Sequence, residues 1–111
     1  MKKILFISFV LLIASGASAA ELKLSGAEIQ AILNDKILYA KDIEQIFQKS
    51  GATFYVSGGN QSQGNWKIEG DKYCSQWPPN QSWACYDFTQ DRNKIAFIAK
   101  DGKRTEMSVT K

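Results

Sequence analysis

The chain has 111 residues, with 14 basic against 11 acidic side chains, no His and two Cys. A chain of this length holds one domain. The lack of His excludes Ser-His and Cys-His nucleophile pairs, and two Cys are too few for a four-thiolate zinc or iron–sulfur site. We therefore expect no metal and no cofactor.

The first 19 residues have the layout of a secretory signal peptide. Two lysines precede the apolar run Ile4–Ala14, and Ala17 and Ala19 occupy the −3 and −1 positions of a cleavage site. A transmembrane helix needs about 20 apolar residues, so this run is too short to span a bilayer comfortably, and an uncleaved N-terminal anchor is the alternative to a signal peptide. We expect cleavage after Ala19, a single domain over 20–111, a periplasmic or secreted location, and no stable membrane insertion after cleavage.

Cleavage also changes the charge. It removes two of the 14 basic residues, which leaves 12 against 11 acidic ones and a net charge of +1. The remaining basic residues are scattered along the chain. A nearly neutral chain without a basic patch is not expected to bind nucleic acid.

The N-terminal part of the domain begins with a helix. Ser25 and Glu28 form the capping-box pattern, and an apolar stripe at helical spacing runs to Leu33, before Asn34 and Asp35 end the helix. A short strand is expected at 37–39. Residues 40–50 fit an amphipathic helix, but a strand stays open there.

From Thr53 onward, short aromatic-rich runs alternate with turn residues, which is typical of strands. The expected strands are Thr53–Ser57, Asn65–Glu69, Lys72–Trp77, Ser82–Thr89, Lys94–Lys100 and Arg104–Val109. Their short connections predict an antiparallel meander. The fold class is therefore α+β: an N-terminal helix packed on a curled, half-barrel or barrel-like sheet of five to seven strands.

The turns predict how the strands pair. A two-residue turn at 70–71 sets Ile68 opposite Tyr73, and a four-residue loop at 78–81 sets Tyr73 opposite Tyr86. The same register opposes Cys74 and Cys85, which predicts a disulfide, as an oxidising compartment allows.

The last hairpin has two candidate turns. A two-residue turn at 101–102 would put Met107 on the wrong face. A three-residue loop over 101–103, with Gly102 near the left-handed region, pairs Phe97 with Met107 and Ile95 with Val109.

These registers predict one apolar and one polar face. The expected inner face collects Phe54, Val56, Trp66, Ile68, Tyr73, Trp77, Tyr86, Phe88, Ile95, Phe97, Met107 and Val109. The expected outer face collects Tyr55, Lys67, Glu69, Cys74, Gln76, Trp83, Cys85, Asp87, Arg104 and Glu106.

The segment Ser57–Gly64 is polar, uncharged and glycine-rich, but it lacks the Lys-Ser/Thr pair of a phosphate-binding loop. It predicts either a mobile hairpin connection or a loop that binds a partner's cleft. The candidate binding residues are Ser57, Asn60, Gln61 and Gln63, together with the outer aromatics Tyr55 and Trp83. Trp83 either belongs to a recognition surface or covers the disulfide.

The motif L-S-G-x-E-I at 24–29, the run G-x-W-x-I-x-G-D-x-Y-C at 64–74, Trp77, Cys85 and the D-G turn at 101–102 carry a resemblance. They resemble an uncharacterised family of small exported alphaproteobacterial proteins, a domain of unknown function. The resemblance covers nearly all of the mature chain and implies export and the fold, but no activity.

A weaker resemblance is to periplasmic lysozyme inhibitors, which are also small, exported, disulfide-linked β-barrels. Ser57-Gly58-Gly59 matches their inhibitory loop poorly. The net charge of +1 also disfavours docking on a strongly basic lysozyme.

We expect a non-enzymatic binding or inhibitor-like module that acts on a protein partner in the periplasm or in a host. The alternatives are a carrier of a small apolar ligand or a secreted effector. The carrier would hold its ligand between helix and sheet, against Trp66, Trp77, Phe88 and Phe97. An enzyme that uses acids such as Glu28 or Asp87 is the third hypothesis.

Overall fold

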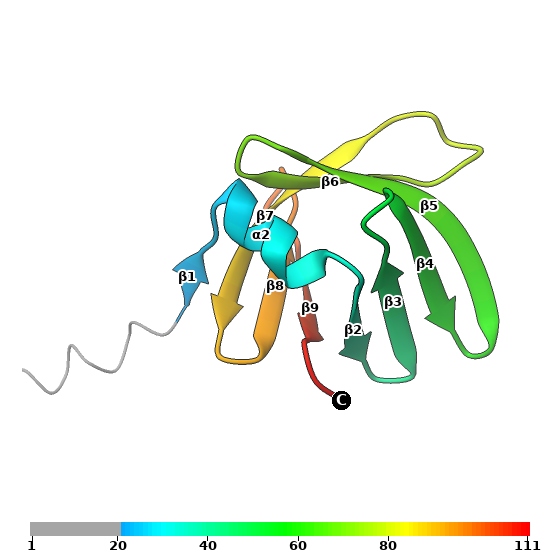
Figure 1. The fold of residues 1–111 in the computed structure, drawn as a ribbon, viewed down its shortest axis with the longest axis horizontal. Helices are drawn as coiled ribbons and strands as arrows, with labels where there is room; N and C mark the ends of the chain where they lie inside the picture. The colour runs from blue at the N-terminus through cyan, green and yellow to red at the C-terminus, as the bar shows by residue number, and fades with distance from the viewer. Residues whose placement is uncertain (1–20) are drawn as a thin grey trace, which may run out of the picture.

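The structure is a computed structural model that describes residues 21–111, so the expected signal peptide lies outside the described residues. The described chain forms one helix and nine strands (Figure 1). In chain order they are β1 Leu22–Lys23, α2 Gly26–Leu33, β2 Lys36–Ala40, β3 Ile43–Phe47, β4 Ala52–Ser57, β5 Asn60–Glu69, β6 Lys72–Gln76, β7 Ala84–Asp91, β8 Lys94–Ile98 and β9 Arg104–Ser108.

Strands β2 to β9 form an eight-stranded antiparallel barrel, in which each strand pairs with its neighbour in sequence. The barrel closes between β2 and β9 through a single residue pair, Tyr39 and Ser108. Strand β1 adds to the far end of β7, beyond the part of β7 that pairs with β6. The expected antiparallel sheet is confirmed, but five to seven strands was too few.

Helix α2 is a single short helix that packs against β2, β5 and β6 (Figure 1). The capping box is confirmed. Ser25 Oγ accepts a hydrogen bond from the Glu28 amide, and Glu28 Oε1 accepts one from the Ser25 amide. The turn between β5 and β6 holds the start of the helix, where the Gly26 amide donates to Asp71 Oδ1 at 2.8 Å. Asp71 therefore connects the β5–β6 turn to the first residue of α2.

The barrel interior near α2 is filled. Ile29 and Leu33 of the helix are fully buried in one cluster with residues from most of the barrel strands. The cluster comprises Leu24, Ile29, Leu33, Leu38, Phe47, Trp66, Tyr73, Phe88, Ile95, Phe97 and Met107. Tyr73 lies at its centre, with ring centroids 5.2 Å from Phe88 and 5.9 Å from Phe47.

The segment 40–50 contains strand β3, so the helical interpretation is wrong. Lys41 and Asp42 form a two-residue turn between β2 and β3, and Asp42 adopts a φ of 59°. An Asp tolerates this left-handed conformation, as hairpin turns of this length require.

The inner face agrees with the sequence except on β4. Gln45 of β3 pairs with Tyr55, and both line the barrel interior. Because side chains alternate along a strand, Phe54 and Val56 point outward. The prediction placed Tyr55 on the outer face and its two neighbours on the inner face, so it assigned the side chains of β4 to the wrong faces of the sheet.

The central registers are confirmed: Ile68 pairs with Tyr73, and Tyr73 with Tyr86. Cys74 pairs with Cys85, and the disulfide between them is present, which is consistent with an oxidising compartment.

The last hairpin differs from both candidate turns. Phe97 pairs with Thr105 and Ile95 with Met107, so the strands are shifted by two residues from the prediction. The loop has three residues, 100–102, and a hydrogen bond from the Ala99 amide to the Lys103 carbonyl oxygen closes it. A shift of two residues keeps each side chain on its face, so Phe97 and Met107 still point inward, as predicted.

Within residues 21–111, no helix combines the length and apolar character needed to cross a membrane.

Candidate functional site

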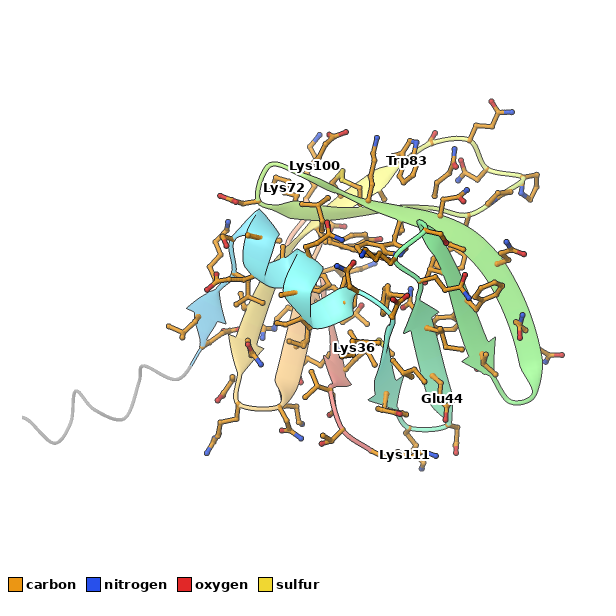
Figure 2. All side chains as sticks on the ribbon, in the orientation of Figure 1. Lys36, Glu44, Lys72, Trp83, Lys100 and Lys111 are labelled. Atoms are coloured by element: carbon orange, nitrogen blue, oxygen red, sulfur yellow. A yellow bond between two sulfur atoms is a disulfide. The ribbon has the colours of Figure 1, made fainter. Side chains whose placement is uncertain are left out.

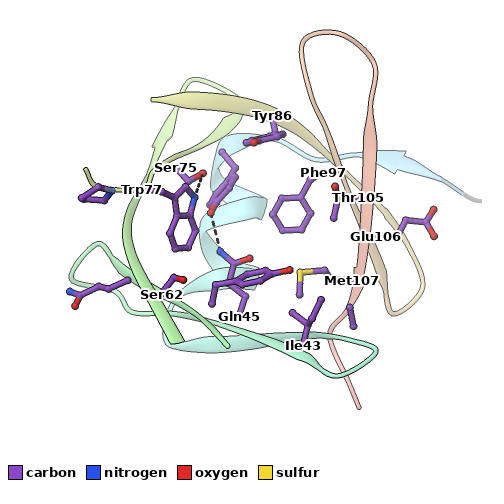
Figure 3. A pocket seen from close by; sticks show the side chains of 15 residues that line it. Ile43, Gln45, Ser62, Ser75, Trp77, Tyr86, Phe97, Thr105, Glu106 and Met107 are labelled. Atoms are coloured by element: carbon purple, nitrogen blue, oxygen red, sulfur yellow. Dashed lines mark hydrogen bonds between the residues drawn. The ribbon is translucent and has the colours of Figure 1, made fainter. Parts of the chain in front are cut away.

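The half of the barrel interior away from the core is a partly open cavity of about 660 Å³ (Figure 3). Residues of every barrel strand, β2 to β9, line the cavity, because each strand directs alternate side chains inward. The lining residues are Ala40, Ile43, Gln45, Tyr55, Ser62, Gln63, Tyr73, Ser75, Trp77, Pro78, Tyr86, Phe97, Thr105, Glu106 and Met107. Its volume lies in the range of small-molecule sites, about 300–1,000 Å³.

Five aromatic rings line the cavity at two depths. Tyr73 and Phe97 are buried and form its floor, with centroids 5.5 Å apart in an edge-to-face arrangement. Tyr55, Trp77 and Tyr86 are partly exposed. The rings of Tyr55 and Trp77 are nearly perpendicular, at 82°, with centroids 6.3 Å apart. Together they make an aromatic corner at the side of the cavity.

Trp77 is held against the wall at Gly64. A β-carbon at position 64 would lie 2.6 Å from Cε3 of the indole, so only Gly lets the ring pack there. The indole Nε1 donates to Ser75 Oγ at 3.3 Å. Packing and hydrogen bond together fix the orientation of this ring (Figure 3).

The polar floor is organised by Gln45, which is only 6% exposed. Its Nε2 donates to Thr53 Oγ1 at 3.1 Å and lies 3.5 Å from the Tyr73 hydroxyl oxygen. Thr53 donates its own hydroxyl proton to the Ile46 carbonyl oxygen, so it accepts from Gln45. This network fixes the amide with its nitrogen toward Thr53 and Tyr73. Among residues 21–111, no hydrogen bond has Gln45 Oε1 as its acceptor, and no buried side-chain oxygen lacks a partner, so this oxygen is accessible from the cavity.

The cavity carries no charge on its inner surface. Within the described part of the chain, no basic side chain lines it, and Glu106 is the one lining carboxylate. Glu106 points away from the cavity (Figure 3) and forms an ion pair with Arg104. Burial raises the pKa of the Tyr73 phenol far above its usual value, so its hydroxyl stays protonated and neutral.

The carrier hypothesis expected a ligand between helix and sheet, whereas the cavity described above is not lined by residues of α2. Trp66 and Phe88 are buried in the packed core on the helix side. Trp77 and Phe97 do line the cavity, and Phe97 also belongs to the core, with its ring centroid 4.3 Å from that of Phe88. Figure 3 shows α2 behind the lining side chains.

The expected binding loop is a regular hairpin. Ser57 pairs with Asn60, and the ladder continues to Thr53 and Gly64, so the backbone is hydrogen-bonded rather than mobile. Residues 57–63 are exposed, as predicted, including Asn60, Gln61 and Gln63. Gln63 also lies at the cavity rim, whereas Ser57, Asn60 and Gln61 do not line it.

Trp83 is exposed on the outer surface, as predicted (Figure 2). Lys67 Nζ lies 4.3 Å from its ring centroid, and Lys67 pairs with Cys74 in the register of β5 and β6. Trp83 and Lys67 therefore lie next to the disulfide, away from the cavity. Glu69 lies close to the two Cys sulfur atoms, but these atoms are bonded to each other and cannot act as thiolate ligands.

The candidate catalytic acids have structural partners. Glu28 completes the capping box of α2. Asp87 accepts a hydrogen bond from Lys72 at 2.8 Å, and this bond lowers the pKa of the Asp87 carboxyl. Neither acid lines the cavity.

Sequence reasoning missed Gln45, Ser62 and Ser75 as site residues. A signal was present for Gln45, since it lies between the apolar residues Ile43 and Phe47 at strand spacing. A polar side chain on the inner face of a strand indicates a cavity or a polar network in place of a packed core.

The fold and the site define a closed antiparallel barrel, packed at one end and with a neutral, aromatic-lined cavity at the other. Comparison with protein-family models, curated proteins and solved structures found no match for the chain.

Proposed function

We propose that this chain is a non-catalytic binding protein that holds a small uncharged molecule in the cavity of its barrel. The observation that carries the proposal is the cavity of about 660 Å³ with five aromatic rings. Apolar walls with a few fixed polar groups are the usual composition of small-molecule sites. This proposal keeps the carrier function that was an alternative from the sequence, but it places the ligand in the barrel cavity rather than between helix and sheet.

The composition of the cavity supports binding rather than catalysis. General acid–base chemistry needs a titratable group within hydrogen-bond reach of the substrate. The chain has no His, and Glu106 points out of the cavity toward Arg104. Tyr73 keeps its proton because its pKa is raised by burial.

Export of the protein to the periplasm or beyond is part of the same proposal. The disulfide and the signal-peptide pattern of residues 1–19 support it. So does the resemblance to the uncharacterised family of small exported proteins. N-terminal sequencing of the exported protein is expected to start at Ala20, and a chain that keeps residues 1–19 would contradict export by this route.

Binding can be tested with N-phenyl-1-naphthylamine, an uncharged dye that fluoresces in apolar sites. We expect saturable binding at one site, weakened about tenfold by Trp77→Ala, which corresponds to about 1.4 kcal/mol. Trp83→Ala is the matched control because Trp83 lies outside the cavity, and it is expected to leave the affinity unchanged. An absence of saturable binding, or equal loss in both variants, would refute a ligand site in the barrel.

The second candidate function is recognition of a protein partner through the tip of the β4–β5 hairpin. The exposure of residues 57–63 favours it. The double variant Asn60→Ala, Gln61→Ala is expected to leave stability within about 0.5 kcal/mol of the original, because both side chains are exposed. It should weaken capture of a partner from periplasmic extract or host lysate. A partner retained equally by both forms would refute this use of the hairpin.

A further inference from the structure

We infer that the molecule bound in the cavity is a neutral sugar ring, held between the Tyr55–Trp77 corner and the polar floor at Gln45. This inference rests on the proposed function and names the class of its ligand. Three properties of the lining residues carry it: the absence of charge, the arrangement of the aromatic rings, and an acceptor without a protein donor.

The electrostatics favour an uncharged ligand. No basic side chain of residues 21–111 lines the cavity, so a phosphate, sulfate or carboxylate would lose its hydration without gaining a cation. The one lining carboxylate, Glu106, is turned outward and paired with Arg104 at 3.3 Å. Burial of an unpaired charge is costly, so both anions and cations are disfavoured inside.

The aromatic corner suits the faces of a sugar ring. The face of an aromatic ring carries partial negative charge, and the C–H groups on one face of a sugar carry partial positive charge. The rings of Tyr55 and Trp77 contact each other edge to face, and the corner that they form offers aromatic surface to a ligand in the cavity. Trp77 cannot turn freely, because Gly64 and Ser75 hold the indole.

The floor suits the hydroxyl groups at the edge of the same ring. Gln45 Oε1 is fixed by the bonds of its own amide nitrogen and has no protein donor among the described residues. Ser75 Oγ accepts from Trp77, and the Ser75 side chain also forms a hydrogen bond with Tyr73, so it holds both rings in place. Ser62 and Thr105 add hydroxyl groups to the lining. A sugar can donate to the amide oxygen and accept from the hydroxyl groups.

An acyl chain or another wholly apolar ligand fits this floor less well. It would cover Gln45 Oε1 without forming a hydrogen bond to it. Burial of an unsatisfied polar group is costly, so the floor discriminates in favour of hydroxylated ligands.

The test is an array of neutral and uronic-acid oligosaccharides, followed by calorimetric titration of the best neutral binder, a measurement that does not depend on the Trp77 indole. Binding of neutral oligosaccharides is expected, weakened at least about tenfold by Trp77→Ala. Gln45→Leu is expected to weaken it about threefold to tenfold, as loss of one hydrogen bond does. Ser75→Ala gives a second floor variant in case Gln45→Leu fails to fold. Gln48→Ala is the matched control, because Gln48 is exposed and lies outside the cavity, and it should have no effect.

The outcomes separate this inference from the proposed function. Binding of N-phenyl-1-naphthylamine with no binding of neutral oligosaccharides would overturn the sugar assignment and leave the ligand site standing. Preference for the uronic-acid forms, or sugar binding unchanged by Trp77→Ala, would also overturn it. If neither dye nor oligosaccharide binds, the inference and the proposed function both fail.

Discussion

At the residue scale, Gly64 places Trp77 in the cavity. Gly64→Ala would put a β-carbon 2.6 Å from both the indole Cε3 and the Gln76 carbonyl oxygen. We expect this variant to lower the free energy of unfolding by about 1–3 kcal/mol, as overpacking does, and to weaken dye binding because the indole must move. Urea denaturation and dye titration check both effects.

The matched control for Gly64→Ala is Asn65→Ala, at the next position of β5. Asn65 is exposed, so its substitution should change stability by no more than about 0.5 kcal/mol and leave dye affinity unchanged. If Gly64→Ala behaved like this control, Trp77 would not depend on the close approach to β5.

Tyr55 shows why single residues of the site were difficult to place from the sequence. Phe54 and Val56 are more apolar than Gln45, Tyr55 and Ser62, so the usual rule of apolar side chains inside assigns them to the core. The rule holds for β6, where Tyr73 is buried. It fails for β4 because the interior next to Tyr55 is an open cavity, where polar side chains remain solvated.

At the element scale, helix α2 depends on a contact that reverses the usual effect of Gly in a helix. Gly→Ala within a helix normally gains up to about 1 kcal/mol. At Gly26 a β-carbon would lie 2.1 Å from the Gly70 carbonyl oxygen, so Gly26→Ala must push the helix away from the β5–β6 turn. We expect a loss of about 1–3 kcal/mol in urea denaturation.

Ala31→Gly is the control for the helix, because Ala31 is exposed on α2. It is expected to cost about 1 kcal/mol through helix propensity alone. A gain in stability from Gly26→Ala would show that α2 does not dock on the turn.

Strand β1 is expected to detach in acid. The hydrogen bond from Arg104 and, next, that from Thr89 lower the pKa of Glu21 below its ordinary value of 4.5. A lowered pKa in the folded state means that the contact stabilises the fold above pH 4.5 and is lost as pH falls through the folded-state pKa. The protection of the Leu22 and Lys23 amides from hydrogen exchange, taken relative to the intrinsic rate at each pH, should therefore decrease as pH falls through the folded-state pKa.

Asp87 also titrates with a lowered pKa, through Lys72 first, and its carboxylate lies 3.8 Å from Lys23 Nζ. Two variants separate the contributions to the acid release of β1. Arg104→Gln should remove most of the pH dependence, whereas Lys72→Gln should leave the Glu21 contribution in place. The reverse result would assign the release of β1 to Asp87.

The hairpin of β2 and β3 shows the limit of pattern reasoning for whole elements. Ile43, Ile46 and Phe47 fit a helical stripe, while Ile43, Gln45 and Phe47 fit the inner face of a strand. The choice depends on the turn at 41–42, whose Lys-Asp sequence is a weak hairpin signal. Where turn chemistry is strong, as in the Gly-Asp turn of β5 and β6, the predicted register is confirmed.

At the scale of the whole molecule, the meander and the disulfide could be predicted, whereas the sequence left open whether the sheet is a half-barrel or a closed barrel. The registers of the central strands followed from the lengths of the turns and from the pairing of apolar residues. Both features lie close together in the sequence. Closure depends on the one pair between Tyr39 and Ser108, which joins the first and last barrel strands. Because the prediction left open whether the sheet closes, it did not locate the cavity inside the barrel.

Reduction of the disulfide tests how the barrel wall and the site are linked. Cys74 and Cys85 join β6 and β7 on the outer side of the wall, across a sequence separation of 11 residues. In the chain-entropy model, closing such a short loop stabilises the fold by about 2–4 kcal/mol. The inward side chains of the same strands, Tyr73 and Tyr86, pack on the opposite face, so we expect the fold and dye affinity to survive reduction.

Urea denaturation with and without a thiol reductant measures the loss of stability, and the double variant Cys74→Ala, Cys85→Ala should not respond to the reductant. Loss of the cavity's dye binding in the reduced but still folded protein would show that the cross-link, rather than the aromatic packing, shapes this wall.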